Sequence, residues 1–222
     1  EMNASANRGS CMQLCRRGYI VKDRETDIEL AIENQYIMSP KDLKTIRFMD
    51  RMIEAGVQVF KIEGRARGPE YVRTVAECYG EAIQAVLDGD FTDEKKDNWD
   101  KRLATVFNRG FWDGYYLGQR LGEWNDQYGS QATETKVYVG KCTDWFSKIE
   151  VAEFSIEAAP ISAGDKLMVT GATTGCITFN LDDPRVDLKT VETVPQGVRV
   201  SFKTPERVRR GDKLFKVISR TN

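Results

Sequence analysis

The residues best suited to chemistry form a cysteine motif near the start of the sequence. Cys11 and Cys15 lie four residues apart within residues 7–19, NRGSCMQLCRRGY. If the turn between them is helical, the two thiolates can reach one soft metal centre, and the neighbouring arginines favour the thiolate forms. The alternative is that both are buried cysteines beside a solvated basic face. We take Cys11 and Cys15 as candidate metal ligands.

The sequence contains no histidine, and this excludes several kinds of catalytic site. Ser-His-Asp triads, Cys-His dyads and HExxH zinc sites cannot be assembled within these 222 residues. The five cysteines, an odd number at irregular spacing, do not match a secreted disulfide framework. Cys78, Cys142 and Cys176 are expected to be small apolar core residues.

Neither a membrane span nor a secretory signal is recognisable in the sequence. No stretch approaches the ~20 consecutive apolar residues that a span needs. The first residues, EMNA, lack the basic and then apolar layout of a secretory signal. We therefore expect a cytoplasmic protein without a membrane partner.

A second polar group follows a short apolar run. Residues 57–62, VQVFKI, predict a strand, and Lys61, Glu63, Arg65 and Arg67 lie at its end, where α/β barrels carry site residues. Lysine and arginine there can hold a carboxylate or a phosphate, such as a small organic-acid donor or an RNA backbone, with the glutamate orienting them. The alternative is a salt-bridged barrel rim.

The elements that would position these residues alternate between helix and strand. Residues 39–56 predict a helix that begins at a Ser-Pro pair, and residues 68–89 predict a second helix between Gly-Pro and Gly. A complete eight-stranded α/β barrel takes ~250 residues, so this segment supplies only one or two of its units. We predict that residues 1–118 are the C-terminal end of a TIM-barrel-like catalytic domain, with a linker over residues 119–135.

From residue 136 to residue 222 the pattern changes to short alternating runs separated by turn residues, which is typical of an all-β domain. The expected strands cover residues 137–139, 149–151, 166–169, 198–202 and 213–217.

Within this β-domain the sequence Gly-Asp-Lys-Leu occurs twice, at residues 164–167 and 211–214. Each Gly-Asp is expected to make a tight turn into a strand. The arrangement is similar to the small β-barrel of translation factors. Arg207, Arg209 and Arg210 form a basic cluster that we take as a candidate RNA-binding site, although such clusters are more often simply solvated. Residues 136–222 carry 14 Lys and Arg against 11 Asp and Glu, which permits RNA contact without requiring it.

Four segments resemble motifs of the collagenase-like peptidase family U32. They are NRGSCMQLCRRGY, YIMSPKDL, VFKIEGRARGPEYV and FNRGFWDGYYLG, in this order within residues 7–118, and the β-domain resembles the family's C-terminal module. The family includes proteins described as proteases or collagenases, and proteins that hydroxylate uridine or cytidine in tRNA or rRNA with an iron–sulfur cluster on four cysteines. The resemblance implies that Cys11 and Cys15 are two ligands of a 4Fe-4S cluster whose other cysteine pair lies upstream.

Three functions remain open at this point. The leading one is an iron–sulfur enzyme that hydroxylates a tRNA or rRNA pyrimidine, to which this segment alone would contribute an inactive part. The second is a peptidase acting on collagen-like substrates. The third is a β-domain that only binds RNA or protein.

Overall fold

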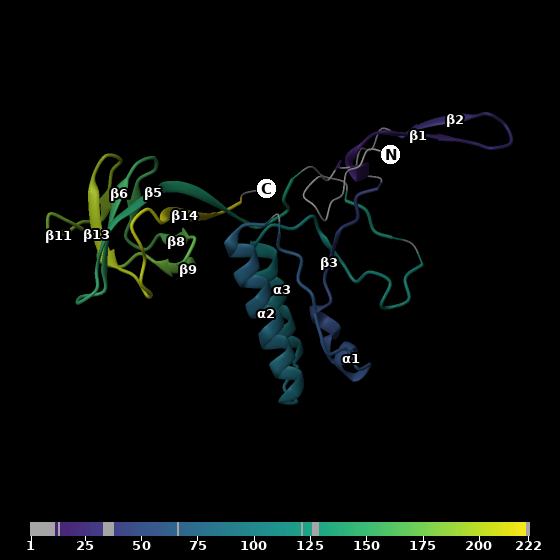
Figure 1. The fold of residues 1–222 in the computed structure, drawn as a ribbon, viewed down its shortest axis with the longest axis horizontal. Coiled ribbons are helices and arrows are strands. Elements are labelled where there is room, and N and C mark those ends of the chain that lie inside the picture. The colour runs from purple at the N-terminus through teal and green to yellow at the C-terminus, as the bar shows by residue number, and fades with distance from the viewer. Residues whose placement is uncertain are drawn as a thin grey trace.

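The computed structural model describes residues 12, 14–32, 38–65, 67–120, 122–125 and 129–220. Figure 1 shows a projecting β-hairpin, a group of helices and a β-domain, arranged in this order along the molecule. The helices and the β-domain each bury a separate hydrophobic core. In the described part of the chain, none of the helices combines the length and apolarity needed to cross a membrane.

The helical part is built from short elements around two longer helices. They are η2 (Leu14–Arg16), β1 (Tyr19–Lys22), β2 (Glu29–Ile32), β3 (Asp42–Leu43), η3 (Ile46–Phe48), α1 (Met49–Glu54), α2 (Pro69–Leu87), α3 (Asp93–Thr105) and β4 (Phe111–Trp112). Strands β1 and β2 form the antiparallel hairpin, and β3 pairs with β4 in parallel.

Helix α2 confirms the prediction made for residues 68–89. Pro69 occupies its first turn, where the missing N–H costs nothing, and Gly89 follows its end with a φ of 71°. Helix α3 begins at the N-cap Thr92, whose hydroxyl accepts from the backbone N–H of Lys95. Trp99 of α3 belongs to the same buried cluster as the inner face of α2: Val75, Cys78, Ala82 and Ala85.

Three expectations for the helical part are not met. The TIM-barrel end is not confirmed, because the described residues contain a single parallel pair of two-residue strands. Residues 57–62 form no strand, since no neighbouring segment in the described part offers them a hydrogen-bond ladder. Helical structure begins only at Ile46, because Pro40 and residues 42–43 are instead used in β-pairing with segments far along the chain.

The prediction of an all-β second part is confirmed, but the strand expected at residues 149–151 is wrong, because residues 147–150 form a turn and the strand begins at Val151. Eight strands form one antiparallel sheet in the order β11-β10-β13-β6-β5-β14-β8-β9. Their bounds are β5 (Glu134–Phe146), β6 (Val151–Ile156), β8 (Lys166–Gly171), β9 (Gly175–Asn180), β10 (Arg185–Val186), β11 (Lys189–Thr190), β13 (Arg199–Lys203) and β14 (Lys213–Ser219). A further pair joins β7 (Ile161–Ser162) and β12 (Thr193–Val194).

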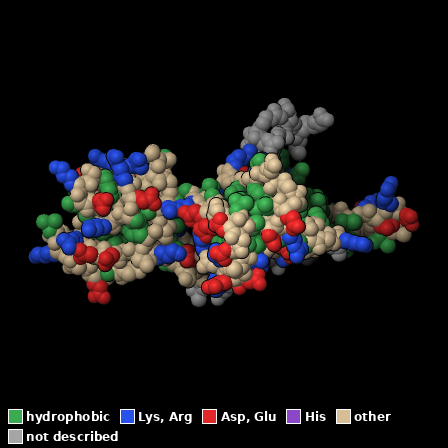
Figure 2. All heavy atoms as spheres, turned by 90° about the horizontal axis from the view of Figure 1, so that it is seen from below, with side chains coloured by type: hydrophobic (Ala, Val, Ile, Leu, Met, Phe, Trp, Pro, Cys, Tyr) green, Lys and Arg blue, Asp and Glu red, His purple; other side chains and the backbone are tan. Residues whose placement is uncertain are grey.

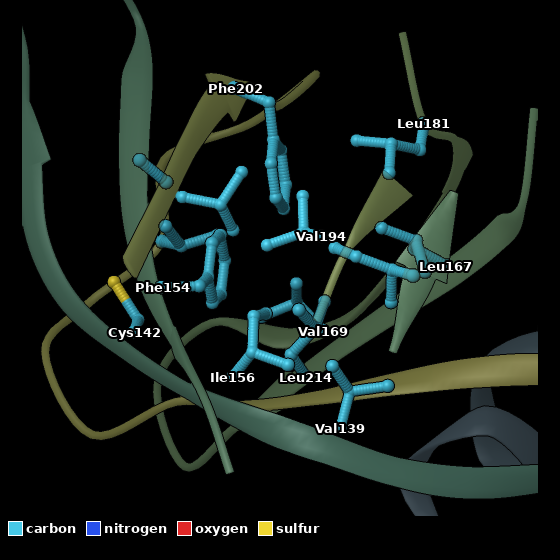
Figure 3. Close-up of a cluster of buried hydrophobic side chains, with 14 of the residues drawn as sticks. Val139, Cys142, Phe154, Ile156, Leu167, Val169, Leu181, Val194, Phe202 and Leu214 are labelled. Atoms are coloured by element: carbon cyan, nitrogen blue, oxygen red, sulfur yellow. The ribbon is translucent and has the colours of Figure 1, made fainter. Parts of the chain in front are cut away.

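The inward side chains of these strands meet in one core, which Figure 3 shows in close-up. Phe154 and Phe202 are stacked at its centre with ring centroids 4.9 Å apart. Gly140 lies where β5 passes β6, and a Cβ there would clash with the carbonyl oxygen of Ser155. The core therefore depends both on apolar burial and on one position without a side chain.

The two Gly-Asp repeats make the same turn, as predicted. Gly164 and Gly211 have φ values of 87° and 90°, and β8 and β14 begin two residues later. In each turn the Asp side chain accepts from the backbone N–H three residues earlier, Ser162 in one case and Arg209 in the other, at 2.7 and 2.8 Å. The aspartate thus fixes the turn from which the strand starts.

Candidate functional site

Several of the segments that resemble family U32 motifs meet at a polar junction in the helical part. The backbone N–H of Asp42 donates to the carbonyl of Gly110 at 2.8 Å, which is part of the β3–β4 pairing. Residues 122–125 close the other side, because Asn125 donates its N–H to the carbonyl of Ser39 at 2.8 Å. Ser39, Asn108 and Asn125 are all buried, so polar groups form the interior of this junction.

Asp42 is the centre of the site. Its carboxylate accepts from Arg109 through Nε at 3.0 Å, Nη2 at 2.6 Å and the backbone N–H at 2.9 Å. The guanidinium of Arg67 approaches the same carboxylate at 3.8 Å. Two cations therefore share one anion, and the cluster of Asp42, Arg67 and Arg109, which we call the Asp42 cluster, retains one positive charge.

Aromatic rings fix the orientation of Arg67. Its guanidinium lies 3.8 Å from the ring centre of Phe107 and 5.6 Å from that of Tyr71. Burial raises the pKa of the Tyr71 phenol, with a further rise from the Asp42 charge that Arg67 partly offsets. Rings on a guanidinium face leave its N–H edge for polar partners, of which the Asp42 carboxylate and the Tyr71 hydroxyl are two, and a carboxylate or phosphate is a ligand of the same kind.

Of the four residues predicted at the end of the 57–62 segment, only Arg67 joins the Asp42 cluster. Lys61, Glu63 and Arg65 are exposed on an irregular segment, where the Glu63 carboxylate accepts from the backbone N–H of Arg65 at 3.1 Å. A substrate-binding role for the four together stays a prediction. Sequence reasoning missed Asp42 because it was assigned to a helix, and its partner Arg109 lies 67 residues away.

Cys15 lies on the turn η2, while Cys11 falls outside the described residues. The Cys15 thiol is free and half-buried. The turn is closed by the N–H of Arg17, which donates to the carbonyl of Leu14 at 3.3 Å, and by the Arg17 guanidinium, which donates to the carbonyl of Met12 at 3.2 Å. A partly exposed thiol on a short helical turn beside an arginine fits a ligand for a soft metal centre.

The other three cysteines differ from Cys15. Cys78, Cys142 and Cys176 are buried, and burial raises the pKa of the Cys78 and Cys142 thiols to about 11 and also raises that of Cys176. Thiols of this kind are poor metal ligands at neutral pH and serve as packing. Within the residues that the structure describes, no three His, Cys, Asp or Glu side chains are grouped to hold a metal ion.

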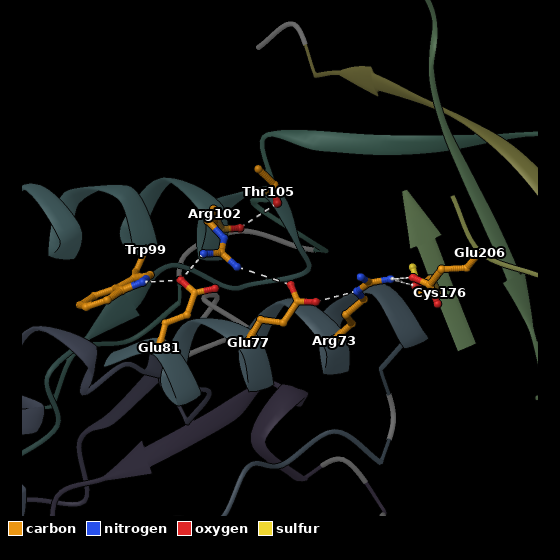
Figure 4. Close-up of polar contacts among 8 residues, drawn as sticks. All are labelled: Arg73, Glu77, Glu81, Trp99, Arg102, Thr105, Cys176 and Glu206. Carbon is orange, nitrogen blue, oxygen red and sulfur yellow. Dashed lines mark hydrogen bonds and ion pairs between the residues drawn. The ribbon is translucent and has the colours of Figure 1, made fainter. Parts of the chain in front are cut away.

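A chain of polar contacts connects the helices to the β-domain (Figure 4). Glu81 accepts from Trp99 at 2.9 Å and from Arg102 at 2.5 Å, and Arg102 reaches Glu77 at 3.4 Å. Arg73 donates to Glu77 at 2.7 Å and also contacts the Cys176 carbonyl of β9.

Beside this contact lies a cavity of about 450 Å³ between α2 and the β-domain. Most of its charged lining is already paired, as in the 2.7 Å contact between Lys136 and Glu70 and the 2.8 Å contact between Lys166 and Glu134. These pairs make the cavity part of the junction between the helices and the β-domain.

The candidate RNA-binding arginines lie on the connection between β13 and β14. Arg207 and Arg210 are exposed, whereas Arg209 is half-buried and donates to the hydroxyl of Thr174 at 3.0 Å. Arg209 therefore has a structural contact, whereas Arg207 and Arg210 are solvated. A role of the three arginines in RNA binding stays a prediction.

Known proteins that are similar to this chain indicate its family. The model of Peptidase family U32 matches residues 1–126. A collagenase of Porphyromonas gingivalis is 59% identical over 216 residues, which cover 97% of this chain and 52% of the collagenase. A tRNA hydroxylation protein of Bacillus subtilis is 31% identical over 134 residues, which cover 59% of this chain and 32% of that protein.

One solved structure, the C-terminal domain of a U32 peptidase from Geobacillus thermoleovorans, aligns with 36% of this chain and 90% of its own length, at a TM-score of 0.34 and 12% identity. The chain spans about half the length of curated relatives that it matches over nearly all of its own length. The family match covers more than half of the 222 residues, and the chain belongs to peptidase family U32.

Proposed function

We propose that the full-length protein is an iron–sulfur enzyme that hydroxylates a pyrimidine in tRNA or rRNA. The observation that carries this proposal is the state of Cys15, a free and partly exposed thiol on a turn beside arginine, in a chain whose other described cysteines are packed in cores. Similarity to a protein named for tRNA hydroxylation gives the substrate class.

In this proposal Cys11 and Cys15 hold two corners of a 4Fe-4S cluster, and two cysteines outside these 222 residues hold the others. When bound, such a cluster supplies one-electron redox chemistry. The residues of this chain hold the thiol turn in place through Arg17 and bind the anionic part of a substrate or a small organic-acid donor at the Asp42 cluster.

The anion-binding role follows from charge. Asp42 accepts three hydrogen bonds from Arg109, so the Arg67 guanidinium at 3.8 Å makes a weaker contact and retains donors for a ligand. A carboxylate or phosphate at the edge of Arg67 would form charge-assisted hydrogen bonds. Arg67→Lys would keep the charge but remove the planar fork, and so separates these two contributions.

The test is a hydroxylation assay on the full-length protein reconstituted with iron and sulfide under anaerobic conditions, with a small-molecule extract of the same cells as the source of the organic-acid donor, which supplies the oxygen atom and takes up the electron pair. Transfer RNA and ribosomal RNA from cells lacking the protein would be incubated with it, and nucleosides would be analysed by mass spectrometry. A gain of one oxygen on a pyrimidine nucleoside, lost in Cys15→Ser and retained in the core control Cys176→Ala, is the expected result. RNA without new hydroxylated nucleosides would reject the proposal.

One observation favours a second function, a peptidase acting on collagen-like substrates. The relative that is 59% identical over nearly all of this chain is named a collagenase. Against it, the chain holds no histidine for a nucleophile–base pair, and its buried thiols have raised pKa values. Cleavage of gelatin by the full-length protein, abolished by a single substitution, would establish this function instead.

A further inference from the structure

One cross-strand row on the outer face of the β-sheet carries three cations. Arg199 of β13 lies opposite Ser155 of β6, Ser155 lies opposite Lys141 of β5, and Lys141 lies opposite Lys213 of β14. Directly opposite residues of antiparallel strands point to the same face, so the three cations share one side of the sheet. We call Arg199, Lys141 and Lys213 the cation row.

Burial confirms that this side faces solvent. All three members of the cation row are exposed, and the residues next to the row along each strand are buried. Those buried neighbours are Gly140, Cys142, Phe154, Ile156, Val200 and Leu214. Neighbouring strands lie about 4.8 Å apart, which places Lys141 and Lys213 about 5 Å from each other and Arg199 about 10 Å from Lys141.

Placing Lys213 directly opposite Lys141 is unfavourable for the fold by itself. Like charges opposite each other destabilise a sheet, and neutral residues there would avoid this cost. Lys141 is partly compensated by Glu157 at 2.9 Å, and Arg199 by Glu153 at 3.5 Å. In the described part of the chain Lys213 has no ion pair.

Further positive charge lies beside the row. The connection that leads into Lys213 carries Arg207 and Arg210, both exposed and without an ion pair among the described residues. Figure 2 shows lysine and arginine side chains gathered along one edge of the β-domain, whereas acidic side chains gather over the helices. The hydroxyl of Ser155, between Arg199 and Lys141 in the row, adds a neutral donor of the kind that contacts phosphate oxygens.

We propose that the cation row, with Arg210 beside it, binds the phosphate backbone of a single RNA strand. This inference rests on the proposed function for its choice of RNA as the polyanion. The row carries lysines, an arginine and a hydroxyl, which are groups that contact phosphate oxygens, and we expect binding that does not depend on the base sequence. The uncompensated Lys213 is then a functional residue maintained at a cost in stability.

The test uses the chain as it stands and a short fluorescent oligouridylate, with binding followed by anisotropy at several salt concentrations. Lys213→Glu removes the uncompensated cation and puts an opposite charge across from Lys141. Lys189→Glu makes the same charge change at an exposed position of β11, in the same sheet but outside the cation row. Polyglutamate serves as a competitor of another chemical class.

We expect Lys213→Glu to reduce the salt dependence, the slope of log K against log salt, by about 0.7 and to weaken binding roughly eight-fold near 50 mM salt. The same variant should have a higher Tm than the wild type, because it replaces a repulsive cross-strand pair with an attractive one. A variant that folds better and binds worse cannot owe its weaker binding to misfolding. Lys189→Glu should retain the slope of the wild type.

Equal weakening by the two variants, or no binding of oligouridylate at low salt, would overturn the inference. Competition by polyglutamate as effective as by unlabelled RNA would assign the row to an acidic protein partner instead. The assay needs no cluster, so RNA binding with the expected variant pattern but without hydroxylation would reject the proposed function and leave the cation row in place.

Discussion

Replacing Asp42 with asparagine tests whether the Asp42 cluster holds the helical part together. The carboxylate accepts three hydrogen bonds from Arg109, at 2.6, 2.9 and 3.0 Å, and its side chain is 20% exposed. Hydrogen bonds to charged groups contribute about 1.5–3 kcal/mol each, but asparagine keeps one oxygen acceptor and solvent screens part of the charge. The variant also leaves Arg67 and Arg109 close together without an anion.

We expect Asp42→Asn to lower the free energy of unfolding by about 2–3 kcal/mol. For a unit of about 100 residues this corresponds to a Tm lower by roughly 10 °C, which calorimetry can resolve as an earlier transition of the helical part. The matched control is Asp97→Asn, because Asp97 makes one ion pair with Arg47 at 2.8 Å and its side chain is 60% exposed. Equal Tm values for the two variants would refute a stabilising role for the Asp42 cluster.

Two further predictions concern the β-domain and the thiols. Gly140→Ala should unfold the β-domain or lower its stability by more than about 3 kcal/mol, because the new methyl group clashes with the Ser155 carbonyl. The control Gly80→Ala, in the open middle of α2, should instead stabilise the protein by up to about 1 kcal/mol. Chemical denaturation of both variants distinguishes steric exclusion from a general effect of losing glycine. Iodoacetamide at about pH 8 should label Cys15 before Cys78 and Cys142. These two thiols are buried with pKa values raised to about 11, and they ionise only as the pH approaches that value. Mass spectrometry of the peptides would contradict this if Cys142 were labelled as fast as Cys15.

Local patterns allowed much of the fold to be predicted. The Gly-Pro start and Gly end of α2 and the two Gly-Asp turns depend on backbone preferences of neighbouring residues, which the sequence displays directly. The burial of individual residues is less predictable, because Leu87 is apolar yet 67% exposed at the last residue of α2.

Features that depend on distant segments could not be predicted. Residues 57–62 have the β-branched and aromatic composition of a strand, but a strand also needs a neighbour that supplies its ladder. Ser39 and Pro40 resemble a helix start, yet Pro40 bridges to Trp124, and this pairing determines the local conformation. Asp42 and Arg109 are 67 positions apart, and the cation row joins residues up to 72 positions apart, so only the three-dimensional structure reveals them.

The proposed function depends on Cys15 as a ligand of an iron–sulfur cluster. The most direct measurement is the iron and sulfide content of the full-length protein, with its visible absorbance spectrum, after anaerobic reconstitution of the wild type, Cys15→Ser and the buried control Cys176→Ala. We expect four irons and a visible absorption band in the wild type and the control, both lost in Cys15→Ser. A wild type that remains colourless and free of iron, or a Cys15→Ser variant with a full cluster, would contradict it.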